Sequence, residues 1–86
     1  MEKTYIGTTF LSYQGLDYVI SYSLDRAIIF STEIMDEIQT IRNLRNNLVC
    51  ILKSDNGCIY LLMTDSIQVL QPQLQQGGQI IWKKQY

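Results

Sequence analysis

The chain has 86 residues, of which 47% are apolar and 17% are charged, and it contains no histidine. This composition is typical of a compact folded protein, and we expect residues 1–86 to form a single domain. A net charge of −1 argues against binding nucleic-acid phosphates through a concentrated positive surface, and the missing imidazole removes the commonest acid–base group and metal ligand.

The first predicted element is a β-hairpin over about residues 3–24, with its turn at Gln14–Gly15. A two-residue loop there pairs Tyr13 with Leu16 and sets the register of both strands. One face then collects aromatic and aliphatic side chains, namely Tyr5, Leu11, Tyr13, Leu16, Tyr18, Ile20, Tyr22 and Leu24. The opposite face holds polar residues and an apolar patch of Ile6, Phe10 and Val19. A sheet that is apolar on both faces needs a second cover.

A short strand over residues 26–30 and a central helix over about residues 32–46 are expected next. Ala27–Phe30 is apolar throughout, as in a strand buried on both sides. Ser31 or Thr32 can cap the helix, and its acidic start and basic end complement the helix dipole. Apolar residues recur at helical spacing and predict one core-facing stripe of Ile34, Ile38, Ile41, Leu44 and Leu48.

A second hairpin is predicted over about residues 48–64, around Asp55-Asn56-Gly57. A short strand at Ile67–Leu70 ends before Pro72, because proline cannot donate to a sheet. A glutamine-rich loop over residues 71–79 and a terminal strand over residues 79–86 complete the chain. The sequence therefore predicts an α+β fold: a curved antiparallel sheet of five to seven strands, two hairpins flanking one helix, in the order β-β-β-α-β-β-(β)-β.

The sequence offers little for catalysis or for metal binding. Neither Cys50 nor Cys58 has a histidine to act as its base, and two cysteines alone cannot complete a tetrahedral zinc site. The acidic cluster of Glu33, Asp36 and Glu37 is explained by the dipole of the predicted helix. We therefore expect no catalytic residue, no metal and no cofactor.

The ends of the chain and the cysteines bear on location. The first ten residues contain no apolar segment of the kind found in secretory signals, and no apolar stretch is long enough for a membrane span. Hairpin geometry keeps Cys50 and Cys58 apart, so we expect two free thiols and a reducing compartment. The sequence predicts a cytoplasmic protein with no membrane contact.

Six tyrosines are many for this length, and four of them fall on one face of the first hairpin. They either pack under the helix or form an aromatic platform for a partner. The arginines near the end of the predicted helix and the Trp-Lys-Lys motif of the last strand are further candidates for partner contact, each with a structural alternative at the edge of the core or within it. The candidate partner-binding residues are Tyr5, Tyr13, Tyr18, Tyr22, Arg42, Arg45, Trp82, Lys83 and Lys84.

These observations favour a small non-enzymatic intracellular module that binds another protein and acts as its inhibitor, adaptor or regulator. A place among phage or mobile-element genes would suit an inhibitor, although no residue shows such an origin. A homodimer through the sheet or the C-terminal strand would also use the excess apolar surface. The alternative is a nucleotide or single-stranded nucleic-acid binder that uses the tyrosine face, although the charge makes nucleic acid the weaker partner. A lesser alternative is an enzyme whose site forms between subunits.

Overall fold

The computed structural model describes residues 7–42 and 48–84, which form eight β-strands and no helix. The strands in chain order are β1 (Gly7–Tyr13), β2 (Leu16–Tyr22), β3 (Ala27–Ser31), β4 (Asp36–Ile41), β5 (Leu48–Lys53), β6 (Ile59–Met63), β7 (Ile67–Leu74) and β8 (Ile80–Lys84). Within these residues no helix is long and apolar enough to cross a membrane.

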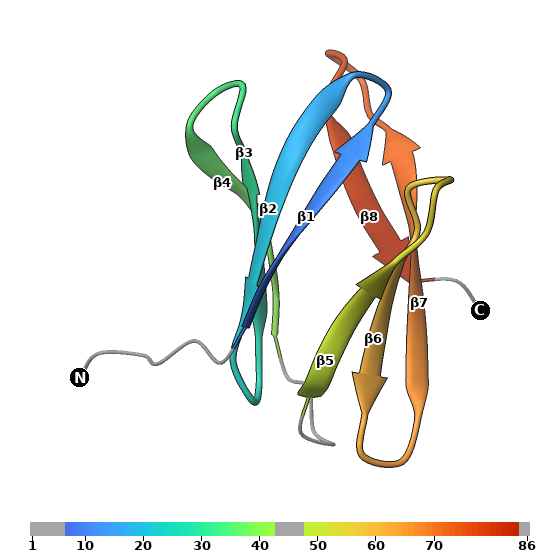
Figure 1. Ribbon diagram of the computed structural model, residues 1–86. Coiled ribbons are helices and arrows are strands. Elements are labelled where there is room, and N and C mark those ends of the chain that lie inside the picture. Colours follow the sequence, from blue (N-terminus) through green and yellow to red (C-terminus); the bar gives the residue numbers. More distant parts are fainter. Residues whose placement is uncertain (1–6, 43–47, 85–86) are drawn as a thin grey trace.

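The strands form two four-stranded antiparallel sheets that lie face to face (Figure 1). Sheet A runs in the order β1-β2-β3-β4 and sheet B in the order β5-β6-β7-β8, so each strand pairs with its neighbours in the sequence. The prediction of an α+β fold with one curved sheet of five to seven strands is therefore wrong. Another sheet, rather than a helix, covers the tyrosine-bearing face of the first hairpin, and the two inner faces bury a shared core.

The first hairpin has the register that the sequence predicts. Tyr13 pairs with Leu16 across the turn, and the pairing continues to Gly7 and Tyr22. Gln14 and Gly15 both have positive φ, which a two-residue hairpin loop of this type requires. The alternation of side chains then turns Leu11, Tyr18 and Ile20 into the core. The predicted short strand at residues 26–30 corresponds to β3.

The predicted helix over residues 32–46 is wrong, because its described part forms a turn and the strand β4. Met35 has a φ of 57°, a left-handed conformation that an α-helix does not contain. The acidic residues expected at a helix start lie in this turn and at the beginning of β4. Residues 43–47, and with them Arg45, lie outside the described residues.

A β-bulge in β4 explains why this segment resembles a helix in sequence. Ile29 pairs with Gln39 and Phe30 pairs with Glu37, so Ile38 is an extra residue in β4. A bulge breaks the two-residue alternation of a strand, and both Ile38 and Ile41 pack against the core although they lie three residues apart. The same spacing of three is typical of a helix face, which is the reason for the wrong prediction.

Strand β7 is longer than predicted, because it continues through Pro72 to Leu74. Pro72 pairs with Trp82 of β8. The N–H and C=O of Trp82 both bond to the side chain of Gln39 in β4, on the side of β8 away from β7. This position of the ladder therefore needs no N–H from the proline. Gln71–Leu74 therefore belong to the strand, and the predicted loop is reduced to a tight turn over residues 75–79, where Gly77 and Gly78 have positive φ.

Two side-chain contacts join the sheets along their edges. The amide of Gln39 in β4 donates from Nε2 to the carbonyl of Trp82 at 2.7 Å, and its Oε1 accepts the Trp82 N–H at 2.8 Å. This amide thereby takes the place of a neighbouring strand beside β8. On the other side, the ammonium group of Lys53 in β5 donates to the carbonyl of Phe10 in β1. Both contacts occupy backbone groups that an edge strand would otherwise leave unpaired.

The Gln39 contact gives a first test of this arrangement. Gln39→Ala leaves the half-buried N–H and C=O of Trp82 without their partners, so we expect it to lower the free energy of unfolding by about 2 kcal/mol. Gln73→Ala, at an exposed position of β7, is the matched control and should change stability by less than about 0.5 kcal/mol. Urea denaturation followed by circular dichroism measures both, and equal losses would contradict the role assigned to Gln39.

Candidate functional site

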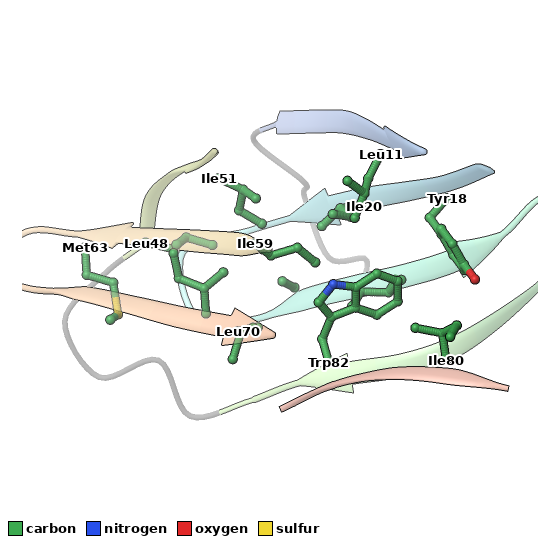
Figure 2. Close-up of a cluster of buried hydrophobic side chains, with 13 residues drawn as sticks. Leu11, Tyr18, Ile20, Leu48, Ile51, Ile59, Met63, Leu70, Ile80 and Trp82 are labelled. Carbon is green, nitrogen blue, oxygen red and sulfur yellow. The ribbon is translucent and has the colours of Figure 1, made fainter. Parts of the chain in front are cut away.

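The structure turns the described tyrosines of the first hairpin towards the core. Tyr18 is only 3% exposed, and its ring packs edge-on against Trp82 with 4.9 Å between the ring centroids (Figure 2). Tyr13 and Tyr22 are half-buried and pack against the same core. The predicted Tyr5 lies outside the described residues. These rings fill the space between the sheets, so Tyr18 offers no aromatic platform at the surface.

The other predicted partner residues do not form one site. Trp82 is buried, and its indole Nε1 donates to the carbonyl of Gly57 at 2.8 Å, so it anchors β8 in the core. Lys83 and Lys84 are exposed at the end of β8, and Arg42 is exposed after β4 on the other sheet. Among the described candidates, the two lysines are the pair of charged residues that lie together.

The outer face of sheet B carries a group of exposed and half-buried apolar residues that sequence reasoning did not identify. Residues on this face alternate with the core residues Ile51, Ile59 and Leu61. The strand register places them in two rows, one across Cys50, Leu62 and Ile67, and the other across Leu52, Tyr60 and Val69. We call these six residues the docking face.

The docking face contains no charged residue, and much of its surface is open to solvent. Leu52 is 54% exposed and Ile67 is 61% exposed, while the four residues between them are half-buried. On β8, Lys83 lies on the same side of the sheet as the docking face, where it pairs with Gln71. An uncharged apolar patch of this size on a sheet is the kind of surface that protein partners cover.

The sequence signal for this face is the unbroken apolar run Ile59–Met63, which has no polar alternation. Such a run is typical of a strand that is covered on both sides. In the structure, sheet A covers only the inner side, which buries Ile59, Leu61 and Met63. The side chains of Tyr60 and Leu62 remain on the outer side without a cover from the described chain.

The outer face of sheet A differs in charge. Phe10 is 65% exposed there, beside Val19 and Phe30 in one row of the register. The row ends at Glu37, and Asp17 lies on the same face, where it accepts a hydrogen bond from the Ser12 hydroxyl at 2.6 Å. The acidic groups interrupt this patch, so the docking face of sheet B is the better candidate for a dry protein contact.

A second feature is a pocket lined by residues of the β3–β4 and β7–β8 turns and of β2, β3, β4 and β8. The two turns lie at the same end of the sandwich (Figure 1). The volume of the pocket is about 300 Å³. The side chains of Leu16, Ile38 and Ile80 and the ring of Tyr18 form its apolar part, and Ser31 and Glu33 also line it. Burial and the nearby Glu33 carboxylate raise the pKa of the Tyr18 hydroxyl above its usual value of 10.0, so this hydroxyl is neutral at physiological pH. We call this cavity the end pocket.

The cysteines and acidic residues do not gather into a chemical site. Cys58 is buried, Cys50 is half-buried on the docking face, and both are free thiols. Within residues 7–42 and 48–84, no group of three or more Cys, Asp or Glu side chains could hold a metal ion.

Comparison with known protein families, with curated proteins and with solved structures finds no match for this chain.

Proposed function

We propose that this protein is a small non-enzymatic module of the cytoplasm that binds a larger protein through its docking face and acts as an inhibitor, adaptor or regulator of that protein. One observation carries the proposal, namely the uncharged apolar outer face of sheet B, with Leu52 and Ile67 more than half exposed. Covering such a face removes apolar surface from water, which is the main driving force of protein association.

The charges around the docking face indicate the chemistry of the partner. Lys83 lies on the outer side of β8, where it pairs with Gln71, whereas Lys84 pairs with the core residue Leu70 and so lies on the other side of the sheet. A complementary partner surface is apolar at its centre and has a carboxylate at the margin that meets Lys83. Lys83 then contributes to orientation and association rate, and the six face residues supply most of the affinity.

The experiment compares two charge insertions of matched exposure. The double variant Leu52→Glu/Ile67→Glu places carboxylates on the docking face, whereas Phe10→Glu places one on the outer face of sheet A. All three positions are exposed, so both variants should fold, which circular dichroism checks. Proteins retained from lysates of cells that express this chain are then purified and titrated against each variant.

The expected result is a partner that forms a stoichiometric complex with the wild-type chain and with Phe10→Glu, and that binds the docking-face variant at least tenfold more weakly. A partner that binds all three proteins equally would contradict the assignment of the docking face. Light scattering supplies the other decisive outcome. If the purified chain forms a dimer that the docking-face variant abolishes, the occupant is a second copy and the larger partner is ruled out.

A further inference from the structure

The end pocket is a candidate binding site that is separate from the docking face. It lies at the end of the sandwich that contains the β1–β2, β3–β4 and β7–β8 turns, whereas the docking face lies on the outside of sheet B (Figure 1). At about 300 Å³ the end pocket has the size of a site for a small molecule or for one long side chain.

Two side chains that carry hydroxyl groups, Ser31 and Tyr18, line the end pocket. Ser31 is 7% exposed and Tyr18 is 3% exposed, and they pair across β2 and β3 on the inner face. Figure 2 shows the hydroxyl end of Tyr18 turned away from the centre of the core, on the side of Ile80, which also lines the pocket. Hydroxyl groups in an otherwise apolar pocket can accept hydrogen bonds from a ligand and fix its orientation.

The negative charge at the end pocket favours a cationic ligand. Glu33 in the β3–β4 turn is the charged residue among those that line it, and none of the described lining residues is a lysine or an arginine. The Glu33 carboxylate lies close enough to oppose ionisation of Tyr18. An anionic ligand would therefore be repelled, whereas a cation would be attracted.

The rim of the end pocket leaves a way in. Gly77 and Gly78 in the β7–β8 turn form part of the lining, and both have positive φ, 89° and 85°. A Cβ atom at either position would meet nothing within 4 Å, so the space beside them is open. No side chain from this part of the turn closes the pocket.

We propose that the end pocket binds a primary ammonium group at the end of a short apolar chain. The apolar chain lies against Leu16, Ile38 and Ile80, and the ammonium group donates its three N–H bonds to the hydroxyls of Tyr18 and Ser31 and to the carboxylate of Glu33. Free alkylamines and the side chain of lysine share this chemistry.

The test uses n-pentylammonium and the neutral isostere 1-pentanol, followed through the backbone amide signals of Ser31, Gly77 and Gly78 in two-dimensional NMR. We expect saturable shifts with n-pentylammonium at millimolar concentration and binding of 1-pentanol that is at least fivefold weaker. Glu33→Gln should weaken n-pentylammonium about fivefold and leave 1-pentanol unchanged. Glu37→Gln is the matched control, because this acid does not line the pocket and the amide can still accept the hydrogen bond of Thr40, and it should change neither.

A second variant and a second probe complete the experiment. Tyr18→Phe keeps the packed ring but removes one acceptor, and it should weaken n-pentylammonium about threefold. Lysine blocked as its N-acetyl N-methylamide distinguishes the two sources: binding as tight as that of n-pentylammonium assigns the pocket to a lysine side chain, and weaker binding assigns it to a free amine. The proposal is overturned if 1-pentanol binds as well as n-pentylammonium, if Glu33→Gln has no effect, or if no saturable shift reaches the pocket amides.

Discussion

Trp82→Ala should lower the free energy of unfolding by about 4 kcal/mol, because Trp82 is one of the largest fully buried side chains of the chain. Its indole packs against Tyr18 of sheet A and donates to the carbonyl of Gly57 in sheet B. Its backbone carbonyl also accepts a hydrogen bond from the side chain of Gln39 in β4. Removing the ring therefore leaves a cavity between the sheets and an unpaired carbonyl at the same time.

Trp82→Phe separates these two contributions. It keeps an aromatic ring near Tyr18 but removes the Nε1 donor, so we expect a loss of about 2 kcal/mol, from the unpaired Gly57 carbonyl and the smaller ring. Phe10→Ala, which removes an aromatic ring at a position 65% exposed, should cost less than about 1 kcal/mol. The urea titration must be monitored by circular dichroism, because Trp82 is the single tryptophan of the chain and both Trp82 variants lose its fluorescence. A cost for Trp82→Phe no larger than that for Phe10→Ala would contradict the anchoring role of Trp82.

Local patterns predict the hairpins of this protein well. The register of β1 and β2 follows from the Gln14–Gly15 turn and the alternation around it, both of which lie within about fifteen residues of sequence. The turn at Asp55-Asn56-Gly57 also predicts the place of the second hairpin, but not its register, because a two-residue loop would pair Cys50 with Met63 and the structure pairs Cys50 with Leu62. Short-range turn chemistry and a two-residue period therefore place both hairpins and set the register of the first.

The wrong helix and the missed docking face have different physical origins. The helix prediction failed on one extra residue, Ile38, whose bulge gives a strand the spacing of a helix. The docking face depends on which side of sheet B meets sheet A, and no local pattern contains that information. Both sides of β6 are apolar, so the run Ile59–Met63 indicates a strand that needs packing partners on both sides. It does not indicate that the described chain covers only the inner side, which holds Ile59, Leu61 and Met63. The end pocket is also non-local, because its walls come from both sheets.

Gly57→Ala should cost about 3 kcal/mol or more, for two reasons that a matched variant can separate. Gly57 has a φ of 89°, which an alanine adopts only at a cost of about 1–2 kcal/mol. In addition, the new Cβ would overlap Cδ1 and Cε1 of the Tyr13 ring, which are ring atoms near the base of a half-buried side chain rather than a flexible end. The Tyr13 ring must therefore move, and the Gly57 carbonyl that receives the Trp82 indole N–H moves with its turn.

Gly77→Ala isolates the backbone contribution, because Gly77 has the same φ of 89° but open space where the Cβ would lie. We expect it to cost about 1 kcal/mol, so the difference between the two variants measures the contact of the β5–β6 turn with β1. Tyr13→Ala should remove most of that difference, since a double-mutant cycle with Gly57→Ala reports their direct coupling. If Gly57→Ala and Gly77→Ala cost the same, the Tyr13 ring does not lie against the turn, and the two sheets are not joined at that end in the way described.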